Sequence, residues 1–264
     1  MRVSRLTVLL ALLLAPACGE ELDPVTFLQD PRVLAIVAEP IEAGPGEEVT
    51  LRPVLYVPEG AAVSSTTWRF CPMTFGPMAA YACLLPTPPC LVDLEAEADG
   101  SVKANPSTLA LACLAHARTL ADLDVGVPGE GPDKVETVFF LTVELDDGRR
   151  RESVMRVPLH TAPVEAPRNR HPTLSVLVEG LELGPGVSIH PVAEGDELKL
   201  SVSVDPSSLD PYVDHIGRDR VEEPIVSFFA DAGEFERERD DGVEVENTWA
   251  FREHGTDRSE AHLY

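Results

Sequence analysis

Short apolar or alternating segments bounded by turns recur after residue 32, with a clear period of two at 48–57, and they predict a mainly β protein. Five strand patterns precede residue 160, at 33–37, 48–57, 66–70, 135–145 and 151–159. The turn Asp146-Asp147-Gly148 separates the last two, and this spacing predicts a tight hairpin. The chain contains 24 prolines and 18 glycines, which favours short strands joined by many turns.

The opening order of strand, glycine-containing turn and strand occurs a second time beyond residue 172. Its elements are a strand at 173–179, a turn at 192–196 and a strand at 197–204. A proline-rich stretch lies between the two occurrences, and a weak repeat of this length is typical of tandem domains. We therefore expect a first domain over 33–160, a linker over 161–172 and a second domain over 173–264.

One segment of the first domain has a helical period instead. Asn105 is a good helix cap and Pro106 suits the first helical position, and Ala and Leu then recur at helical spacing over 107–123. We predict one short helix within 71–132, a stretch in which the strand pattern is otherwise lost. Its apolar residues are expected to pack in the core rather than to bind a ligand.

The first 17 residues have the order of a secretory signal. Arg2 and Arg5 precede the apolar run 6–14, and small residues follow at 15–17. The apolar run is shorter than the roughly 20 residues of a membrane-spanning helix. Cys18 stands directly after the predicted cleavage site.

This order resembles the lipobox of bacterial lipoproteins, although Ala15 stands where that family prefers Leu. In the family the cysteine is diacylated and becomes the first residue of the mature protein. The resemblance therefore implies a lipid bilayer as a partner through Cys18, with residues 18–32 as the tether. Gly19 after the cysteine, in place of Asp, implies the outer membrane. The alternative is an ordinary cleaved signal followed by a cysteine that is not acylated.

Export also bears on the other four cysteines, Cys71, Cys83, Cys90 and Cys113. An even number in an oxidising compartment predicts two disulfides. Three pairings are open, and the sequence does not choose between them. A zinc site is excluded by spacing, since no pair has the short separation of structural zinc ligands.

The repeated opening resembles that of bacterial Ig-like domains, and Trp68 lies where such folds often bury a Trp. The resemblance implies two tandem Ig-like β-sandwiches, the first with a disulfide-bearing, partly helical insertion over 71–132. The chain ends at 260–264 as a further strand pattern begins. We therefore expect an incomplete second sandwich, either from a truncated reading frame or because a strand of a partner completes it.

The formal net charge of −24 argues against nucleic acid as a partner, because an acidic surface repels phosphate. Arg149-Arg150-Arg151 is the one basic run in the sequence. Two interpretations of this run are open. It contacts an anionic glycan or lipid head group, or it protects an edge strand with charge.

No motif for nucleophilic, metal-assisted or phosphate chemistry is present in the sequence, so we predict a protein that is not an enzyme and has no cofactor. Asp205, Asp210 and Asp214 form an acidic group after a strand of the second domain and are weak candidates for calcium. Together with His215 they are also the one group to inspect for catalysis. The acidic segment 95–100 imitates the start of a calcium loop, but Pro106 occupies its twelfth position, which predicts a solvated turn.

Taken together, the sequence predicts a membrane-anchored cell-envelope lipoprotein that acts as a non-enzymatic binding or scaffolding module. Its partner would be an envelope protein or a glycan. The alternative is a calcium-dependent adhesion or carbohydrate-binding surface protein.

Overall fold

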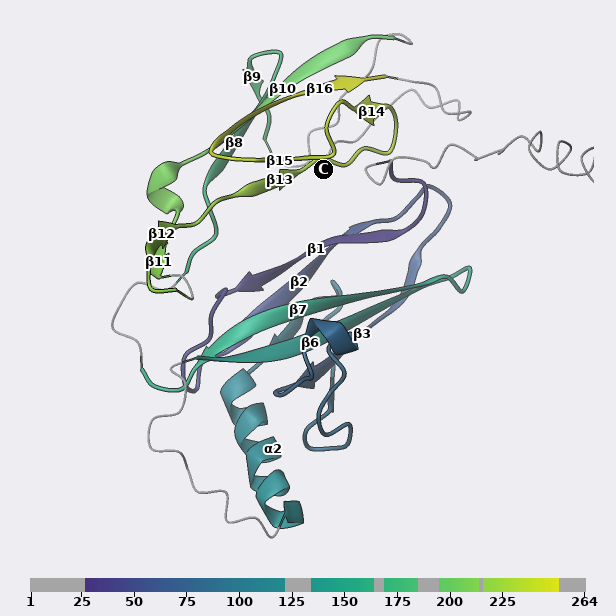
Figure 1. The fold of residues 1–264 in the computed structure, drawn as a ribbon. Helices are drawn as coiled ribbons and strands as arrows, with labels where there is room; N and C mark the ends of the chain where they lie inside the picture. Colours follow the sequence, from purple (N-terminus) through teal and green to yellow (C-terminus); the bar gives the residue numbers. More distant parts are fainter. Residues whose placement is uncertain (1–26, 122–133, 164–168, 185–194, 214–215, 252–264) are drawn as a thin grey trace, which may run out of the picture.

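The computed structural model describes residues 27–121, 134–163, 169–184, 195–213 and 216–251. Antiparallel strands in several sheets make up most of it, which confirms the mainly β class (Figure 1). The strands form two units, one on either side of the predicted linker. The first unit contains a single α-helix among its described residues.

The first unit is a sandwich of two sheets. Its strands are β1 (Arg32–Glu39), β2 (Val49–Tyr56), β3 (Val63–Cys71), β4 (Val92–Leu94), β5 (Val102–Ala104), β6 (Lys134–Leu145) and β7 (Arg150–His160). One sheet has the order β1-β2-β5 and the other β4-β3-β6-β7. Every pair of neighbours is antiparallel. The predicted hairpin is β6–β7, in register from Lys134 opposite His160 to Glu144 opposite Arg150.

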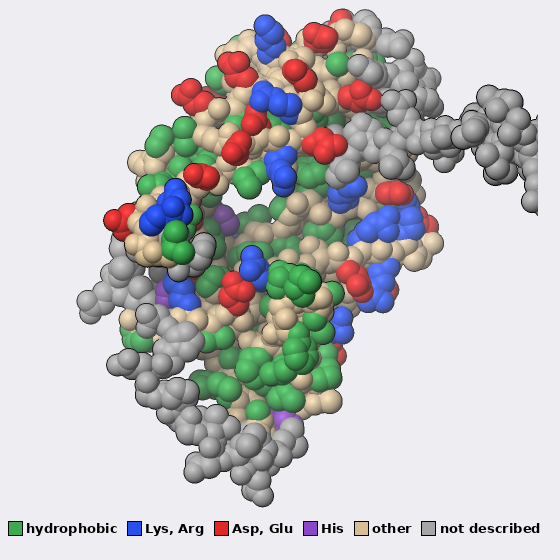
Figure 2. Space-filling view, in the orientation of Figure 1, with side chains coloured by type: hydrophobic (Ala, Val, Ile, Leu, Met, Phe, Trp, Pro, Cys, Tyr) green, Lys and Arg blue, Asp and Glu red, His purple; other side chains and the backbone are tan. Residues whose placement is uncertain are grey.

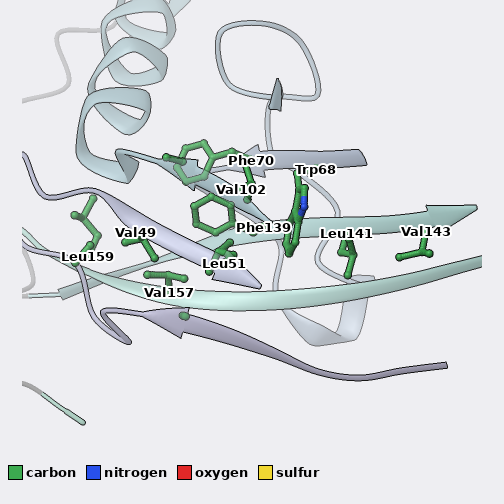
Figure 3. Packing of buried hydrophobic residues seen from close by; sticks show 13 residues of the cluster. Val49, Leu51, Trp68, Phe70, Val102, Phe139, Leu141, Val143, Val157 and Leu159 are labelled. Carbon is green, nitrogen blue, oxygen red and sulfur yellow. The ribbon is translucent and has the colours of Figure 1, made fainter. Parts of the chain in front are cut away.

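Alternate residues of both sheets point inward and form one core, as Figure 3 shows. The cluster contains thirteen buried hydrophobic residues, among them Val49, Leu51, Trp68, Phe70, Phe139 and Leu141. Trp68 on β3 is fully buried, as predicted, and its indole N–H donates to the carbonyl of Gly100 at 2.9 Å. Burial of every second side chain therefore explains the period of two in these strands, because each inward apolar side chain is removed from water.

The connection after β1 joins the two sheets along one side. The N–H of Ala43 donates to the carbonyl of Pro158 at 2.9 Å, and the N–H of His160 donates to the carbonyl of Ala43 at 2.8 Å. Ala43 thereby pairs in parallel with the end of β7. The edge between β1 and β7 is covered at this point, which leaves less unpaired backbone exposed.

The insertion between β3 and β6 contains η1 (Pro77–Ala79), the short strands β4 and β5, and α2 (Pro106–Ala121). The predicted helix start is confirmed, since Oδ1 of Asn105 accepts the N–H of Thr108 at 3.0 Å. This is the side-chain cap that satisfies a backbone donor with no partner inside the helix.

The second unit has one larger sheet and two small ribbons. Its elements are β8 (Leu174–Val178), β9 (Leu181–Glu182), β10 (Glu197–Val204), η2 (Pro206–Ser208), β11 (Pro211–Val213), β12 (Asp219–Val221), β13 (Ile225–Ser227), β14 (Glu234–Phe235), β15 (Arg239–Asp241) and β16 (Glu244–Ala250). The sheet has the order β14-β16-β10-β8-β9, and the ribbons are β11–β12 and β13–β15. Its buried hydrophobic residues form two separate clusters, one of them around the fully buried Trp249.

The described chain begins between the two units. Leu28 is 1% exposed, and its N–H donates to the carbonyl of Ala230 in the second unit at 2.8 Å. Two residues later the chain binds the first unit, where Asp30 lies 2.9 Å from the guanidinium of Arg149. The last residues of the predicted tether 18–32 are therefore packed against the folded units rather than extended from them.

The described end of the predicted linker also contacts both units. Nε2 of His171 lies 2.8 Å from the carbonyl oxygen of Ala38 on β1. The N–H of Arg170 donates to Oδ2 of Asp210 in the second unit at 3.1 Å. The units are thus joined by two segments that are distant in the sequence.

Candidate binding surface

Two disulfides brace the insertion, and they select one of the three pairings. Cys71 is bonded to Cys83 and Cys90 to Cys113, with Cα–Cα distances of 5.9 and 4.5 Å. Cys71 ends the core strand β3, whereas Cys113 lies in α2. The first bond therefore ties the loop with η1 to the sandwich, and the second ties the next loop to the helix. Cross-links of this kind restrict the unfolded chain and hold the loops in place.

Large apolar side chains are exposed on this braced segment. We define the insertion patch as Phe75, Met78, Leu84, Leu111 and Leu114, which are 62%, 99%, 44%, 66% and 41% exposed. Figure 2 shows hydrophobic side chains gathered over η1 and α2. Exposed apolar patches larger than a few hundred Å² are typical of interaction sites, whereas single exposed apolar residues are normal.

The prediction that the apolar residues of the helix pack in the core is wrong for one face of α2. Leu109 and Ala110 do pack against the core, and Cys113 is fully buried. Leu111 lies on the opposite face and Leu114 at the margin of the buried face, four residues after Ala110, and both are exposed. A helix that lies against the end of a sandwich buries one face only, because side chains three and four residues apart share a face.

Charge is distributed unevenly over the insertion, whose carboxylates lie at 93–99 and 122–130. Residues 70–92 contain no charged side chain at all, and residues 101–121 contain Lys103, His116 and Arg118 but no carboxylate. The whole chain has a net charge of −24. The insertion patch is therefore an apolar surface without acidic groups on a strongly acidic protein. The run without charge at 70–92 is visible in the sequence and is the signal that points to this surface.

A buried cluster of titratable groups lies elsewhere, where the β1–β2 connection meets the end of β7. Oε2 of Glu42 is 2.7 Å from Nε2 of His160, and Oε1 is 2.7 Å from Nζ of Lys134. Glu42 and His160 are each 6% exposed. Burial would raise the pKa of Glu42, but the hydrogen bonds from Lys134 and His160 outweigh it and hold the pKa below its ordinary value. Because both carboxylate oxygens are engaged, the cluster fastens the sandwich rather than offering a base to a substrate.

A hollow of about 400 Å³, open to solvent, lies on the outer face of β2 and β5. It is lined by Thr50, Arg52, Glu97, Ala98, Asp99, Ser101 and Lys103. Oδ1 of Asp99 accepts the N–H of Ser101 at 3.0 Å and its hydroxyl at 2.6 Å, and these bonds lower the pKa of Asp99. The acidic segment 95–100 is thus a turn closed on itself, as predicted. Two cations, Arg52 and Lys103, and two carboxylates, Glu97 and Asp99, line the hollow, so their formal charges balance.

The acidic group proposed for calcium is only partly described. Oδ1 of Asp205 accepts the N–H of Ser207 at 2.8 Å, which caps η2 and lowers the pKa of Asp205. The carboxylate of Asp210 accepts the backbone N–H of Arg170 in the linker and lies 3.6 Å from the guanidinium of Arg170. Asp214 and His215 lie outside the described residues. Within the described ranges, no group of three or more His, Cys, Asp or Glu is placed to hold a metal ion.

The arginines of the basic run Arg149-Arg150-Arg151 contact other residues of the same chain. Arg149 binds Asp147 and Asp30, at 2.7 and 2.9 Å. Nε of Arg151 donates to the carbonyl of Pro31 at 2.7 Å. Two of the three arginines therefore hold the segment that precedes β1.

Comparisons of the chain with known protein families, with curated proteins and with solved structures found no match. Cys18, the expected acylation site, lies outside the described residues. Among the helices that the structure describes, none is long and apolar enough to span a bilayer.

Proposed function

We propose that this chain is a membrane-anchored lipoprotein of the cell envelope that acts as a non-enzymatic binding or scaffolding module. Cys18 would hold it in the outer membrane, and the insertion patch would contact its partner. The observation that carries the proposal is the patch itself, which is apolar, free of carboxylates and braced by two disulfides.

We further propose that both units are Ig-like sandwiches. In the first unit, β1, β2 and β5 are neighbours as strands A, B and E are in that fold, and β3, β6 and β7 are neighbours as C, F and G are. The second unit repeats part of this order, with β8-β10-β16 corresponding to A, B and E, and β13–β15 to C and its hairpin partner. Counterparts of β6 and β7 are not among the described residues of the second unit, and 252–264 lies outside them.

Rigidity supports a binding role for the insertion. Association loses free energy when flexible side chains and loops become ordered at the interface. Two disulfides and the contacts of Leu109 and Ala110 with the core already order this segment. Apolar side chains on such a support can act as the few residues that contribute most of the binding energy.

Site-specific crosslinking in the intact envelope tests the proposal. A photoreactive residue at position 78, the most exposed position of the patch, should give crosslinked adducts of the full-length exported chain. The matched control is position 181, a Leu that is 73% exposed on β9 of the second unit. Adducts that form equally at both positions, or at neither, would contradict a binding role for the patch.

Anchoring needs a separate measurement. We expect the mass of the protein extracted from outer membranes to include acyl groups on Cys18, and Cys18→Ser to release the protein from the membrane fraction. Treatment with reductant should add the mass of four hydrogens, two for each disulfide. A soluble cytosolic product that retains residues 1–17 would contradict the proposal.

A further inference from the structure

We propose that the insertion patch is a self-association surface, through which two copies of this chain pair about a two-fold axis. This inference depends on the patch assigned under the proposed function, and it does not depend on acylation of Cys18. The partner is thus a second copy of the same acidic chain.

Charge favours this face over the others. Two copies with a net charge of −24 each repel one another wherever their carboxylates approach. The five residues of the patch lie in the segments 70–92 and 101–121, which have no carboxylate, whereas Asp93, Glu95, Glu97 and Asp99 of the insertion lie between these segments. The exposed apolar residues of the second unit differ in this respect, because Val221 and Ile225 are separated in sequence by Glu222 and Glu223.

The size of the patch fits a weak homodimer. Five side chains with these exposed fractions present on the order of 500 Å² of apolar surface, which is at the upper end for a single patch on a monomer. A standard interface buries roughly 800 Å² on each partner, so the patch alone would supply somewhat more than half of that area. We therefore expect a dissociation constant in the micromolar range rather than an obligate dimer.

The outward face of α2 suits a two-fold contact. Leu111 and Leu114 are three residues apart and form a short exposed ridge. In a two-fold dimer the same patch is used on both copies, so each ridge can pack beside its counterpart on the other helix. Met78 on η1 is an unbranched side chain that can adapt to the facing surface.

A second copy fits this location better than the bilayer does. Leu28, which follows the expected anchor, is held against Ala230 of the second unit. In Figure 1, α2 projects from the first unit on the side away from the second unit. The described chain thus enters the molecule at the boundary between the units, whereas α2, with Leu111 and Leu114, lies on the far side of the first unit.

The test is analytical ultracentrifugation of the exported full chain carrying Cys18→Ser, so that acyl chains cannot drive association. We expect a reversible monomer–dimer equilibrium at concentrations up to about 100 µM. The association should strengthen as salt is raised from about 0.05 to about 0.5 M, because screening weakens repulsion between the acidic chains and leaves apolar contacts intact.

Charge substitutions in the patch provide the decisive comparison. Met78→Asp and Leu111→Asp should each raise the dissociation constant by at least about tenfold. Leu181→Asp adds the same charge at a similarly exposed site in the second unit and should leave association almost unchanged at high salt. Leu111→Ala is the milder variant, and the fluorescence of the buried Trp68 checks that the first unit stays folded.

Four results would overturn self-association. The first is a chain that stays monomeric at every salt concentration, and the second is association that Leu181→Asp weakens as much as Leu111→Asp does. The third is binding of the monomer to phosphatidylcholine vesicles that is lost in Met78→Asp, which would assign the patch to the bilayer. Adducts to a different envelope protein at position 78, with a monomeric chain, would also overturn the dimer and yet leave the proposed binding function standing.

Discussion

The described parts of the two units arrange their buried hydrophobic residues differently. In the first unit thirteen of them form one cluster, whereas in the described residues of the second unit they form clusters of five and three. Both contain a three-strand group of the same order, β1-β2-β5 in one and β8-β10-β16 in the other. The difference lies in what covers that group.

In the first unit, the long hairpin β6–β7 extends the second sheet and supplies Phe139, Leu141 and Val157 to the core. In the second unit, the corresponding cover comes from the loop around Phe228, Ala230 and Ala232. Burial of apolar area is the main favourable term in folding, so a long strand that alternates contributes more than a loop. Both units therefore have regularly paired strands, and among the described residues they differ in whether a long hairpin or a loop covers the three-strand group.

The chain has two tryptophans, and each unit has one of them fully buried. Their fluorescence can therefore follow the two units separately. A Trp249→Phe background leaves Trp68 to report on the first unit, and Trp68→Phe leaves Trp249 to report on the second. Denaturant unfolding in these two backgrounds is the measurement used below.

The largest effect is expected from Phe139→Ala. Phe139 is fully buried, and its ring centroid lies 5.0 Å from that of Phe70. Loss of the ring should lower the free energy of unfolding of the first unit by about 3–5 kcal/mol. We expect the transition reported by Trp68 to move to lower denaturant and that of Trp249 to stay. If both transitions shifted equally, the two units would unfold together.

Gly233→Ala should have the next largest effect, on the second unit. Gly233 has a φ of +72°, and a Cβ there would lie 2.5 Å from the carbonyl oxygen of Ala250 and 2.7 Å from the ring of Trp249. Strain and overlap together should destabilise the second unit by about 3 kcal/mol. Gly148→Ala is the control, with a φ of +84° and nothing within 4 Å of its Cβ, and should cost about 1 kcal/mol in the first unit. If the two substitutions lowered the free energy of unfolding by similar amounts, a close contact between Gly233 and Trp249 would be contradicted.

Glu42→Gln tests the fastening between the β1–β2 connection and β7. Loss of the charged hydrogen bonds with Lys134 and His160 should lower the free energy of unfolding of the first unit by about 1.5–3 kcal/mol at neutral pH. The pKa of Glu42 is lower in the folded state than its ordinary value of 4.5. The carboxylate therefore stabilises the fold fully above pH 4.5, and this contribution is lost as pH falls through the folded-state pKa.

Unfolding of the wild type and of Glu42→Gln, followed with Trp68 at neutral and acidic pH, checks this prediction. The difference in stability between the two proteins should shrink on acidification. A difference that is the same at both pH values would show that the ionised carboxylate is not the stabilising form.

The smallest effect is expected from Asp30→Asn. Asp30 is exposed, and its ion pair with Arg149 should contribute little to the free energy of unfolding and less at high salt, because solvent and salt screen exposed charges. Because this pair holds the segment that places Leu28 against Ala230, the loss should be visible in the transition of Trp249. Glu152→Gln removes an equally exposed ion pair with Arg150 that does not touch this segment, and it should leave Trp249 unaffected. If Glu152→Gln shifted the transition of Trp249 more than Asp30→Asn does, the pair of Asp30 with Arg149 would not be what holds Leu28 against the second unit.

Several elements were predictable because their signals are local. The hairpin turn at 146–148, the burial of Trp68 on a strand and the start of α2 at Asn105-Pro106 each depend on a few neighbouring residues. The candidate surface was harder to predict. The helical pattern over 107–123 indicates that α2 has an apolar face, but it does not tell which of its apolar residues meet the core.

By itself, the sequence determined the mainly β class, the positions of most long strands and the excess of negative charge, since each follows from residue type and spacing. Only the tertiary structure decided the pairing of the four cysteines, the exposure of Leu111 and Leu114, and the contact of Glu42 with His160. These features join residues that are far apart in the chain, Glu42 and His160 by 118 positions. Such contacts depend on how the sheets and the insertion pack in three dimensions, and no local pattern specifies them.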